Sequence, residues 1–510
     1  METKHEGIYD GFKELGTGKM MVLGFQHVFA MFGATVLVPI LTGLSISVTL
    51  LCAGIGTIWF FFITKRKVPI FLGSSFAFLG AFAAIAPKIN GAGNMEMLPY
   101  ASLGVFCAGL VYVILAVLFK IFGAKKIMRL FPPVVTGPII VLIGLNLAAS
   151  AINNAQTNWI LAIAAIVIII CVNMFGKGMI KILPILIGII GAYLLGVIGM
   201  FISKGIGHNL FNLPWVSYDG ITLNEFSDFV AVPKFWNYWF LKPIYSGTFD
   251  WGTAVPAIIT FVVVSIAAMV EHIGDICAIG ATCGKNFIAD PGLTRTLVGD
   301  GIGTSIAGFL GGPANTTYSE NTGVVALTKV YDPRVMLIAA CMTLVLSFLS
   351  IFETFISTIP ASIIGGISIV LYGMISATGV RTIVENKVDF KKFRNVIIAA
   401  LIFVCGLGFA AYNIVIPIGK EMVSSTTRTI EAADTELGEN QTEVSRFMEG
   451  ETEYIVVDTV TQANKYSLAF GGLAVAAIVG IIVNAVLPGK DYEFKIEEEE
   501  EKAAEEVAAG

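Results

Sequence analysis

Long apolar runs recur through most of this chain. A helix needs about 20 apolar residues to cross the hydrocarbon core of a bilayer. Clear runs of this kind lie at residues 20–42, 46–64, 100–120, 130–149, 157–176, 182–202, 253–280, 335–356, 359–379, 395–417 and 466–487. Less regular segments lie at 68–87, 293–311 and 314–330. The pattern predicts an all-α integral membrane protein with about 14 transmembrane segments.

Composition agrees with a membrane protein and excludes other classes. Charged residues make up 14% of the chain and hydrophobic residues 56%, whereas soluble domains carry roughly 25% charged residues. The net charge is −5, and no basic stripe suits a nucleic acid. The seven cysteines lie in apolar stretches without the spacing of a metal site. We therefore expect no nucleic-acid partner, no metal and no cofactor.

Basic residues orient the segments. If both termini lie on one side, the connections on that side hold the basic clusters at 65–67, 120–129, 177–181 and 381–394, while the short connections opposite hold almost none. Because basic loops stay in the cytoplasm, we expect a multi-pass protein of the cell membrane with both termini cytoplasmic. The predicted parts are a cytoplasmic N-terminus at 1–19, a first seven-segment repeat at 20–202, an extracellular loop at 203–252, a second seven-segment repeat at 253–487 that includes an extracellular loop at 418–465, and an acidic cytoplasmic tail at 488–510.

Two signals indicate an internal repeat. The segments at 68–87 and 314–330 are both interrupted by Gly, Ser, Pro, Thr or Asn at membrane depth, and paired interruptions of this kind mark the binding site of transporters. Residues 130–148 also resemble 358–376, because Pro132, Gly137 and Ile139 match Pro360, Gly365 and Ile367 at a constant offset. Since seven is odd, the second repeat must be inverted in the membrane. Inverted repeats predict alternating access around a central site.

A few ionisable residues lie inside the predicted segments. Glu271 and Asp275 are four residues apart and share a helix face. Glu320 follows a broken segment, and His27 lies in the first run. A carboxylate at the bilayer centre costs about 2.5–3.5 kcal/mol, so such residues persist for function or in a compensating pair. Each also has a purely structural interpretation, as a hydrogen-bonded interior group or, for Asp275, as an acid solvated near an inner vestibule.

These groups suit a small, flat, polar solute. Uracil presents ring N–H donors and carbonyl acceptors on its edge. The carboxylates of Glu271 and Glu320 could accept from N–H groups, and bare amides of the broken segments could donate to carbonyls. Two acids in one dry pocket repel, so one of them tends to bind a proton, which gives a route for coupling. The same groups do not exclude other polar solutes.

Several short motifs occur along the chain. The stretch from Glu320 to Lys329, ENTGVVALTK, fits a pattern of Gln, Glu or Pro, then Asn, any residue, Gly, four residues, Thr and a basic residue or Gly. In this pattern the chain resembles the nucleobase–ascorbate transporter family, and bacterial uracil permeases within it. Further resemblances begin at Phe25 (FQHVFAMFGATVLVP), Leu72 (LGSSFAF), Glu271 (EHIG), Asn315 (NTTYSEN) and Leu371 (LYG). The resemblance covers nearly the whole chain apart from the long outside loops and the acidic tail.

The resemblance implies an architecture and a site. Fourteen segments would form a core domain (one to four and eight to eleven) and a gate domain, with short antiparallel strands in segments three and ten, and the protein would form homodimers. Glu271 and Glu320 would bind the base, and the backbone of Phe76 and Ser319 would contact it. The remaining expected site residues are Ser75 beside Phe76, Tyr318 and Tyr372 as pocket walls, His27 as a helper, and Asp275 together with Glu271 in proton coupling.

Departures from the family pattern leave alternatives open. Uracil permeases often carry His where this chain has Asp275, which changes the charge cycle of the coupling group and leaves sodium coupling as an alternative to protons. They often carry Gly where Ser319 stands. Glu320 favours uracil, because xanthine and purine members often carry Gln there, but a xanthine or purine permease remains an alternative. An anion carrier is disfavoured by the acids. An enzyme is disfavoured because no nucleophile–base pair or phosphate loop occurs, and a channel because no filter-like ring occurs.

Overall fold

The computed structural model describes residues 7–89, 92–122, 129–177, 180, 183–206, 208, 211, 213–218, 228–411, 414–431, 441–449, 452–470 and 472–489. The expected tail at 488–510 therefore lies almost wholly outside the described residues. Helices dominate the fold. Their bounds are α1 Gly11–Glu14, α2 Gly16–Thr42, α3 Ile46–Ile63, η1 Phe76–Phe78, α4 Leu79–Ile85, α5 Leu98–Phe122, α7 Pro133–Ala155, α8 Trp159–Phe175, α9 Pro184–Ile206, η5 Phe235–Asn237, α10 Lys242–Tyr245, α11 Trp251–Cys283, η6 Ile288–Gly292, α12 Leu293–Phe309, α13 Ser319–Thr328, α14 Arg334–Ser347, α15 Ser350–Ser357, α16 Ala361–Glu385, α17 Phe393–Ala411 and α18 Gly472–Val486.

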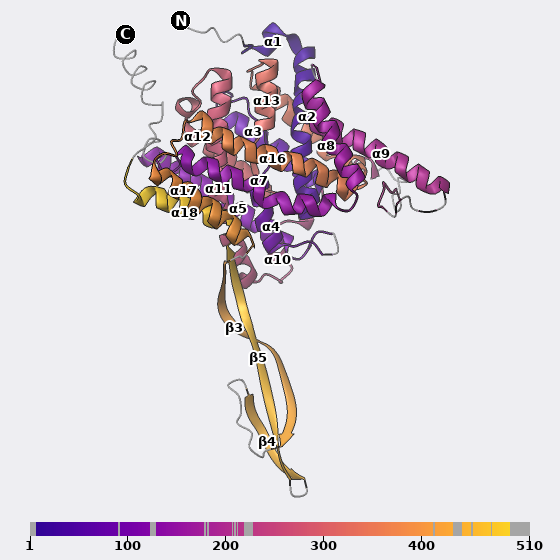
Figure 1. Ribbon diagram of the computed structural model, residues 1–510, viewed down its shortest axis with the longest axis vertical. Helices are drawn as coiled ribbons and strands as arrows, with labels where there is room; N and C mark the ends of the chain where they lie inside the picture. The colour runs from indigo at the N-terminus through magenta and orange to yellow at the C-terminus, as the bar shows by residue number, and fades with distance from the viewer. Residues whose placement is uncertain are drawn as a thin grey trace.

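The helices pack into one body, and a narrow sheet projects from one end of it (Figure 1). Eight of the described helices are long and apolar enough to cross a membrane alone: α2, α3, α5, α7, α9, α11, α16 and α17. The pair α14 and α15 passes the same test as one unit. Every predicted segment overlaps a described helix, while the full count of about 14 crossings stays a prediction.

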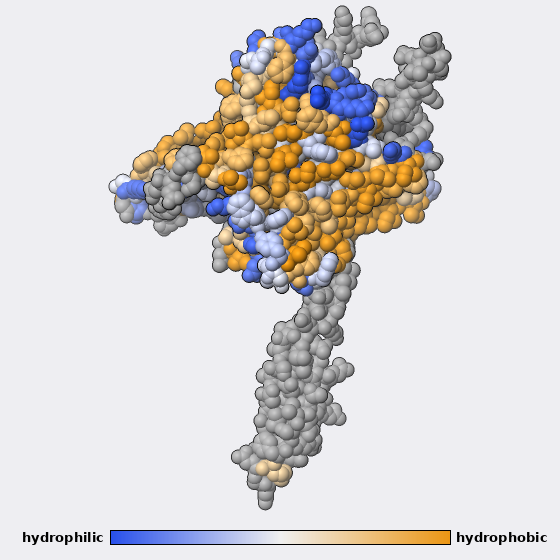
Figure 2. All heavy atoms as spheres, turned by 180° about the vertical axis from the view of Figure 1, so that it is seen from behind, coloured by the Kyte–Doolittle hydropathy of each residue, from blue (hydrophilic) through white to orange (hydrophobic). Residues whose placement is uncertain are grey.

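The outer surface of the body is apolar. Figure 2 shows a broad hydrophobic band across one face, with hydrophilic residues gathered mainly above and below it. On α5 the exposed side chains include Leu110, Ile114, Val117 and Ile121, which follow a helical period and are 43–67% exposed. Exposed apolar surface of this extent marks a face that contacts lipid or another protein. Together with the long apolar helices it indicates that the body lies in a membrane.

The two broken segments meet, as the resemblance implied. Strand β1 (Leu72–Ser74) pairs antiparallel with β2 (Asn315–Thr317), with Leu72 opposite Thr317 and Ser74 opposite Asn315. We call this two-stranded sheet the ribbon. Neighbouring side chains form hydrogen bonds with its free backbone groups: Thr57 Oγ1 lies 2.9 Å from the Leu72 amide nitrogen, and Thr304 Oγ1 donates to the Asn315 carbonyl. Irregular backbone at this depth is tolerated only with such partners. The ribbon therefore forms a fixed crossing point in the core.

Helices α7 and α16 contact each other through glycine. They run antiparallel, because Gly137 lies against Ile383, Gly144 against the Tyr372 carbonyl, and Gly365 against Ala155. The offset that relates Pro132 to Pro360 also relates Gly137 to Gly365 and Ala155 to Ile383, so the first contact is equivalent to the third. The same offset relates Gly144 to Tyr372, the two residues of the second contact. The two segments that resemble each other in sequence are thus packed about a local two-fold axis.

The predicted span at 335–356 is not one straight helix. Helices α14 and α15 meet at an angle of 79°, with Leu349 outside the helical region. Ser347 Oγ donates to the Leu344 carbonyl just before the bend, and such back-bonding is a known cause of helix bending. The bend places Glu353 at the N-terminus of α3, where its carboxylate accepts from the Ile46 amide at 3.0 Å. A carboxylate is favoured there by the helix dipole.

The expectation of an all-α protein is wrong outside the helical body. A three-stranded antiparallel sheet, in the order β3–β5–β4, forms there. It is built from residues of the predicted loop 418–465 and from the flanking ends of the spans predicted at 395–417 and 466–487. The strands are β3 Ile414–Glu431, β4 Gln441–Glu449 and β5 Thr452–Phe470. These stretches are rich in Val, Ile and Thr, which favour strands because β-branched side chains suit a pleated backbone. The helices beside them therefore end at Ala411 and begin at Gly472.

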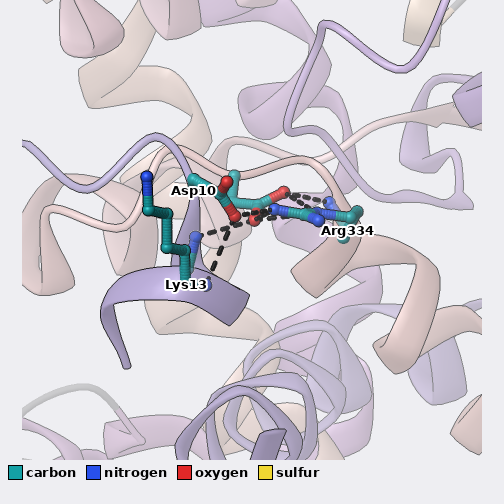
Figure 3. A network of polar contacts seen from close by, with 5 residues as sticks. Asp10, Lys13 and Arg334 are labelled. Atoms are coloured by element: carbon teal, nitrogen blue, oxygen red, sulfur yellow. Dashed lines mark hydrogen bonds and ion pairs between the residues drawn. The ribbon is translucent and has the colours of Figure 1, made fainter. Parts of the chain in front are cut away.

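The N-terminal segment is held against the end of the body opposite the sheet. Arg334 contacts Asp10 at 2.5 Å and Asp332 at 2.6 Å, and the Asp332 carboxylate accepts from the Gly11 amide (Figure 3). Tyr9 adds a hydrogen bond from its hydroxyl to the Cys283 carbonyl at 2.7 Å. These contacts join the start of the chain to the ends of α11 and α14.

Candidate substrate site

Helix α11 carries the acids that the sequence singled out. It begins at Trp251, where the Asp250 carboxylate accepts from the Gly252 and Thr253 amides as an N-cap. The helix runs unbroken to Cys283, so Glu271 and Asp275 lie one turn apart deep inside the body. Asp275 contacts the end of β2 and the start of α13. Glu271 is within electrostatic range of Asp275 and Glu320.

Asp275 is held by the second broken segment. Thr317 Oγ1 donates to its Oδ2 at 2.6 Å, and Ser319 Oγ donates to its Oδ1 at 2.6 Å. The residue is 7% exposed. Two short, charge-assisted hydrogen bonds fix this carboxylate to the end of β2 and the start of α13. Asp275 therefore connects α11 to the strand pair, and the vestibule interpretation of this residue is wrong.

Glu271 offers free acceptor capacity. It is half-buried, and within the described part of the chain its Oε2 atom has no hydrogen-bond partner. An unmet carboxylate oxygen away from water costs a few kcal/mol, which a ligand N–H group would remove. The atom is thus an acceptor that a ligand N–H group can use.

Glu320 and Ser319 form the first turn of α13. The first amides of a helix have no intrahelical acceptor and carry partial positive charge. Phe76 begins η1 beyond the other end of the ribbon, and η1 packs against α11 as α13 does. The site therefore combines acceptors from side chains with donors from backbone.

His27 and Tyr318 hold this arrangement together rather than standing free. The Asn321 side-chain nitrogen lies 3.1 Å from His27 Nδ1 and 3.1 Å from the His27 carbonyl oxygen. The Tyr318 hydroxyl donates to the Ser74 carbonyl at 2.9 Å and accepts from Thr35 Oγ1 at 3.2 Å. His27 thus joins α2 to α13, and Tyr318 joins β2 to β1.

Three other expected site residues lie beyond the Ser74 end of the ribbon. The rings of Phe76 and Tyr372 meet edge to face at 5.7 Å. The Tyr372 hydroxyl and Ser75 Oγ are buried and have no hydrogen bond of normal geometry to any described residue. An aromatic corner with the unbonded Ser75 hydroxyl beside it can hold a flat polar ring.

Sequence reasoning missed Asp300, which lies beside the site. Asp300 on α12 and His272 on α11 are fully buried, with His272 Nδ1 2.9 Å from Asp300 Oδ2 but without the alignment of a hydrogen bond. The signal was present, since Asp300 is an acid in an apolar stretch like Glu271. Thr317 and Asn321 were also missed, because uncharged polar residues carry no insertion cost large enough to mark them.

Comparison with known proteins places the chain in a family. Residues 18–415 match a family described as a permease family. A probable uracil permease of Pasteurella multocida is 38% identical over 404 residues, which cover 78% of this chain and 88% of that protein. The uracil permease of Bacillus caldolyticus is 33% identical over 486 residues and 93% of each chain. A putative pyrimidine permease of Escherichia coli, RutG, is 38% identical over 405 residues, covering 79% of this chain and 86% of that protein.

Solved structures show the same fold at low sequence identity. The transmembrane domain of a cyanobacterium bicarbonate transporter, BicA, superposes with a TM-score of 0.54 at 16% identity, over 80% of this chain and 98% of that domain. SLC26A9 superposes with a TM-score of 0.51 at 14% identity, over 77% of this chain and 63% of that protein. The chain thus shares the fold of these two proteins. By sequence it belongs to the permease family of nucleobase–ascorbate transporters that includes the bacterial uracil permeases, and it is therefore an integral membrane transporter.

Proposed function

We propose that this chain imports uracil together with protons by alternating access, as a cell-membrane protein whose two termini face the cytoplasm. Its uracil permease relatives support nucleobase transport. The observation that carries the proposal is the gathering of Glu271, Asp275 and Glu320 around the paired strands β1 and β2.

In this proposal the base is held by its edge. Glu271 and Glu320 accept hydrogen bonds from its ring N–H groups, while the amides of Phe76 and Ser319 donate to its carbonyls. The free oxygen of Glu271 and the helix starts at Phe76 and Ser319 support these roles.

The remaining residues shape or support the pocket. The rings of Phe76 and Tyr372 form its wall, and the unused Ser75 hydroxyl adds a donor. Tyr318 and His27 act through the ribbon and α13, because the Tyr318 hydroxyl and His27 Nδ1 are already bonded there.

The proposed proton carriers are Asp275 and Glu271, one turn apart on α11. Protonation on the outside with substrate and release on the inside couples the two fluxes. Asp275 also accepts a hydrogen bond from Ser319, the first residue of α13. A change in the charge of Asp275 therefore acts on the helix start that binds the base.

Alternating access follows in the proposal from two inverted seven-segment repeats. The antiparallel contact of α7 and α16 about Gly144 and Tyr372 supports that symmetry. A core domain carrying the ribbon would move against a gate domain carrying α7 and α16, and the protein would act as a homodimer.

The proposal is tested by uptake of labelled uracil into proteoliposomes. Glu271→Gln and Glu320→Gln each abolish uptake, while Glu385→Gln, an exposed acid on α16 paired with Arg381, does not. Wild-type rates in either site variant would remove that residue from the site. Thymine and 5-fluorouracil compete with uracil, whereas strong competition by xanthine alone would identify a purine permease instead.

Sodium coupling is a second candidate, and one observation favours it. The carboxylate of Asp275 and the hydroxyls of Thr317 and Ser319 are oxygen groups, which hard cations prefer. Separate proton and sodium gradients distinguish the two cases. We expect accumulation under the proton gradient, with Asp275→Asn weakening accumulation more than binding. Accumulation driven only by sodium would contradict this.

A further inference from the structure

Two cavities flank α4 on the side of the body from which the sheet projects. The upper cavity, of about 310 Å³, reaches Phe76, Thr260 and Val264. The lower cavity, of about 360 Å³, is bounded by Thr42, Pro87 and Lys88. Both fall within the range of about 300–1,000 Å³ that ligand sites occupy. Neither is part of the acid cluster described above.

The two cavities share a wall. Gly80, Ala83, Asn146 and Leu147 border both of them. The upper cavity is also bounded by Ala410 and Gly472, which adjoin the sheet at the ends of α17 and α18. Together the cavities reach from the sheet side of the body to Phe76, the residue at which the proposed site begins.

The shared wall carries an unused polar atom. Asn146 Oδ1 is buried and has no hydrogen-bond partner within the described ranges. The other residues that border both cavities are Gly80, Ala83 and Leu147, whose side chains offer no hydrogen bond. A primary amide both donates and accepts, which complements the alternating N–H and C=O groups on the edge of a neutral heterocycle.

Gly80 leaves open space between the two cavities, because it has no side chain. A Cβ atom placed on Gly80 would meet nothing within 4 Å, and the residue is exposed to the cavities. A larger side chain at this position would therefore fill the passage without displacing its surroundings.

We propose that the two cavities are one access route for substrate from the sheet side, and that Asn146, on the wall that both cavities share, hydrogen-bonds the ring on that route and sets which rings pass. The inference rests on the proposed function, since the ring is the nucleobase that the acid site then binds. Because Asn146 stands on α7 and Gly80 on α4, the route runs between the proposed gate and core domains.

The first test blocks the route. Gly80→Leu lowers the initial rate of labelled uracil uptake at least about tenfold, because its side chain occupies the passage, while equilibrium binding of uracil to detergent-purified protein stays within about twofold, since the site is then reached from its other side. The matched control is Gly408→Leu on α17, which is also exposed and also has nothing within 4 Å of a Cβ. Equal uptake by Gly80→Leu and Gly408→Leu would overturn the route.

The second test addresses Asn146. Asn146→Leu raises the KM for uptake about two- to tenfold, the effect of one lost hydrogen bond, with binding at equilibrium unchanged. Asn153→Leu, an exposed residue on the same helix, leaves KM unchanged. A wild-type KM in Asn146→Leu would remove Asn146 from the route.

Ala83→Cys covers the case in which Asn146→Leu does not fold. A membrane-impermeant thiol reagent blocks uptake by Ala83→Cys from the sheet side. It leaves the wild type active, because the exposed Cys171, Cys277 and Cys341 line neither cavity. Insensitivity of Ala83→Cys would overturn the inference. A wild-type protein that neither binds nor transports uracil would overturn the proposed function instead, so the two failures are distinguishable.

Discussion

The contact between Gly144 and α16 gives a prediction whose size follows from distances. A Cβ atom added at Gly144 would lie 2.1 Å from the Tyr372 carbonyl oxygen, and ordinary contact begins at 3.4 Å. Because the nearest atom belongs to the backbone, α7 and α16 must separate by about 1.3 Å, or their backbones must take up strained conformations. Overpacking of this kind costs about 1–3 kcal/mol.

The site is sensitive to this separation. Tyr372 carries the ring that meets Phe76 at 5.7 Å, so Gly144→Ala moves one side of that aromatic contact. We expect Gly144→Ala to lower both the melting temperature of the purified protein and the rate of uracil uptake.

Gly373→Ala is the matched control, because it lies on α16 beside Tyr372 but has nothing within 4 Å of its Cβ position. Thermal unfolding in detergent and initial uptake rates are measured for both variants. The reasoning is refuted if Gly144→Ala equals the wild type, or if Gly373→Ala is equally damaging.

Three further predictions follow from other contacts. Thr317→Val removes a 2.6 Å hydrogen bond to Asp275 and is expected to destabilise the fold by about 1.5–3 kcal/mol, whereas Thr317→Ser keeps the hydroxyl; equal melting temperatures for the two would contradict this. Replacing 418–465 by a short Gly/Ser linker leaves uptake within about twofold, because Ile414 and Phe470 are already paired neighbours; loss of uptake in well-inserted protein would assign the sheet a role in transport. Arg334 holds the pKa of the Asp10 carboxyl below its ordinary value of 3.8, so this contact stabilises the N-terminal segment above that pH and is lost as the pH falls below it. Amide hydrogen exchange at 8–15 should therefore be constant from neutral pH down to about 5, after correction for intrinsic rates, and its protection should fall only below about 4.

The parts of the fold that could be predicted are those encoded locally. Apolar length marked the segments, and Gly, Pro and Asn at membrane depth marked the two that are broken. The insertion cost of a charge marked Glu271, Asp275 and Glu320. The repeat at Gly137 and Gly365 was visible because close helix packing requires small residues at fixed spacing.

The parts that could not be predicted depend on contacts between distant residues. Thr317 and Asn321 became visible only when β2 and α13 were placed against α11 and α2. The bend after Ser347 and the sheet from Ile414 were missed, because apolar content alone does not separate a straight span from a bent one or a span end from a strand. Asp300 differs from these, since the test applied to Glu271 would have found it.

Equilibrium binding of uracil to the purified protein tests the central claim most directly. If Glu271 and Glu320 accept hydrogen bonds from the base, then Glu271→Gln and Glu320→Gln each weaken the Kd by about 10- to 150-fold, the range for a hydrogen bond to a charged group, while Glu385→Gln leaves it unchanged. Wild-type affinity in both site variants, with the fold intact, would contradict the account.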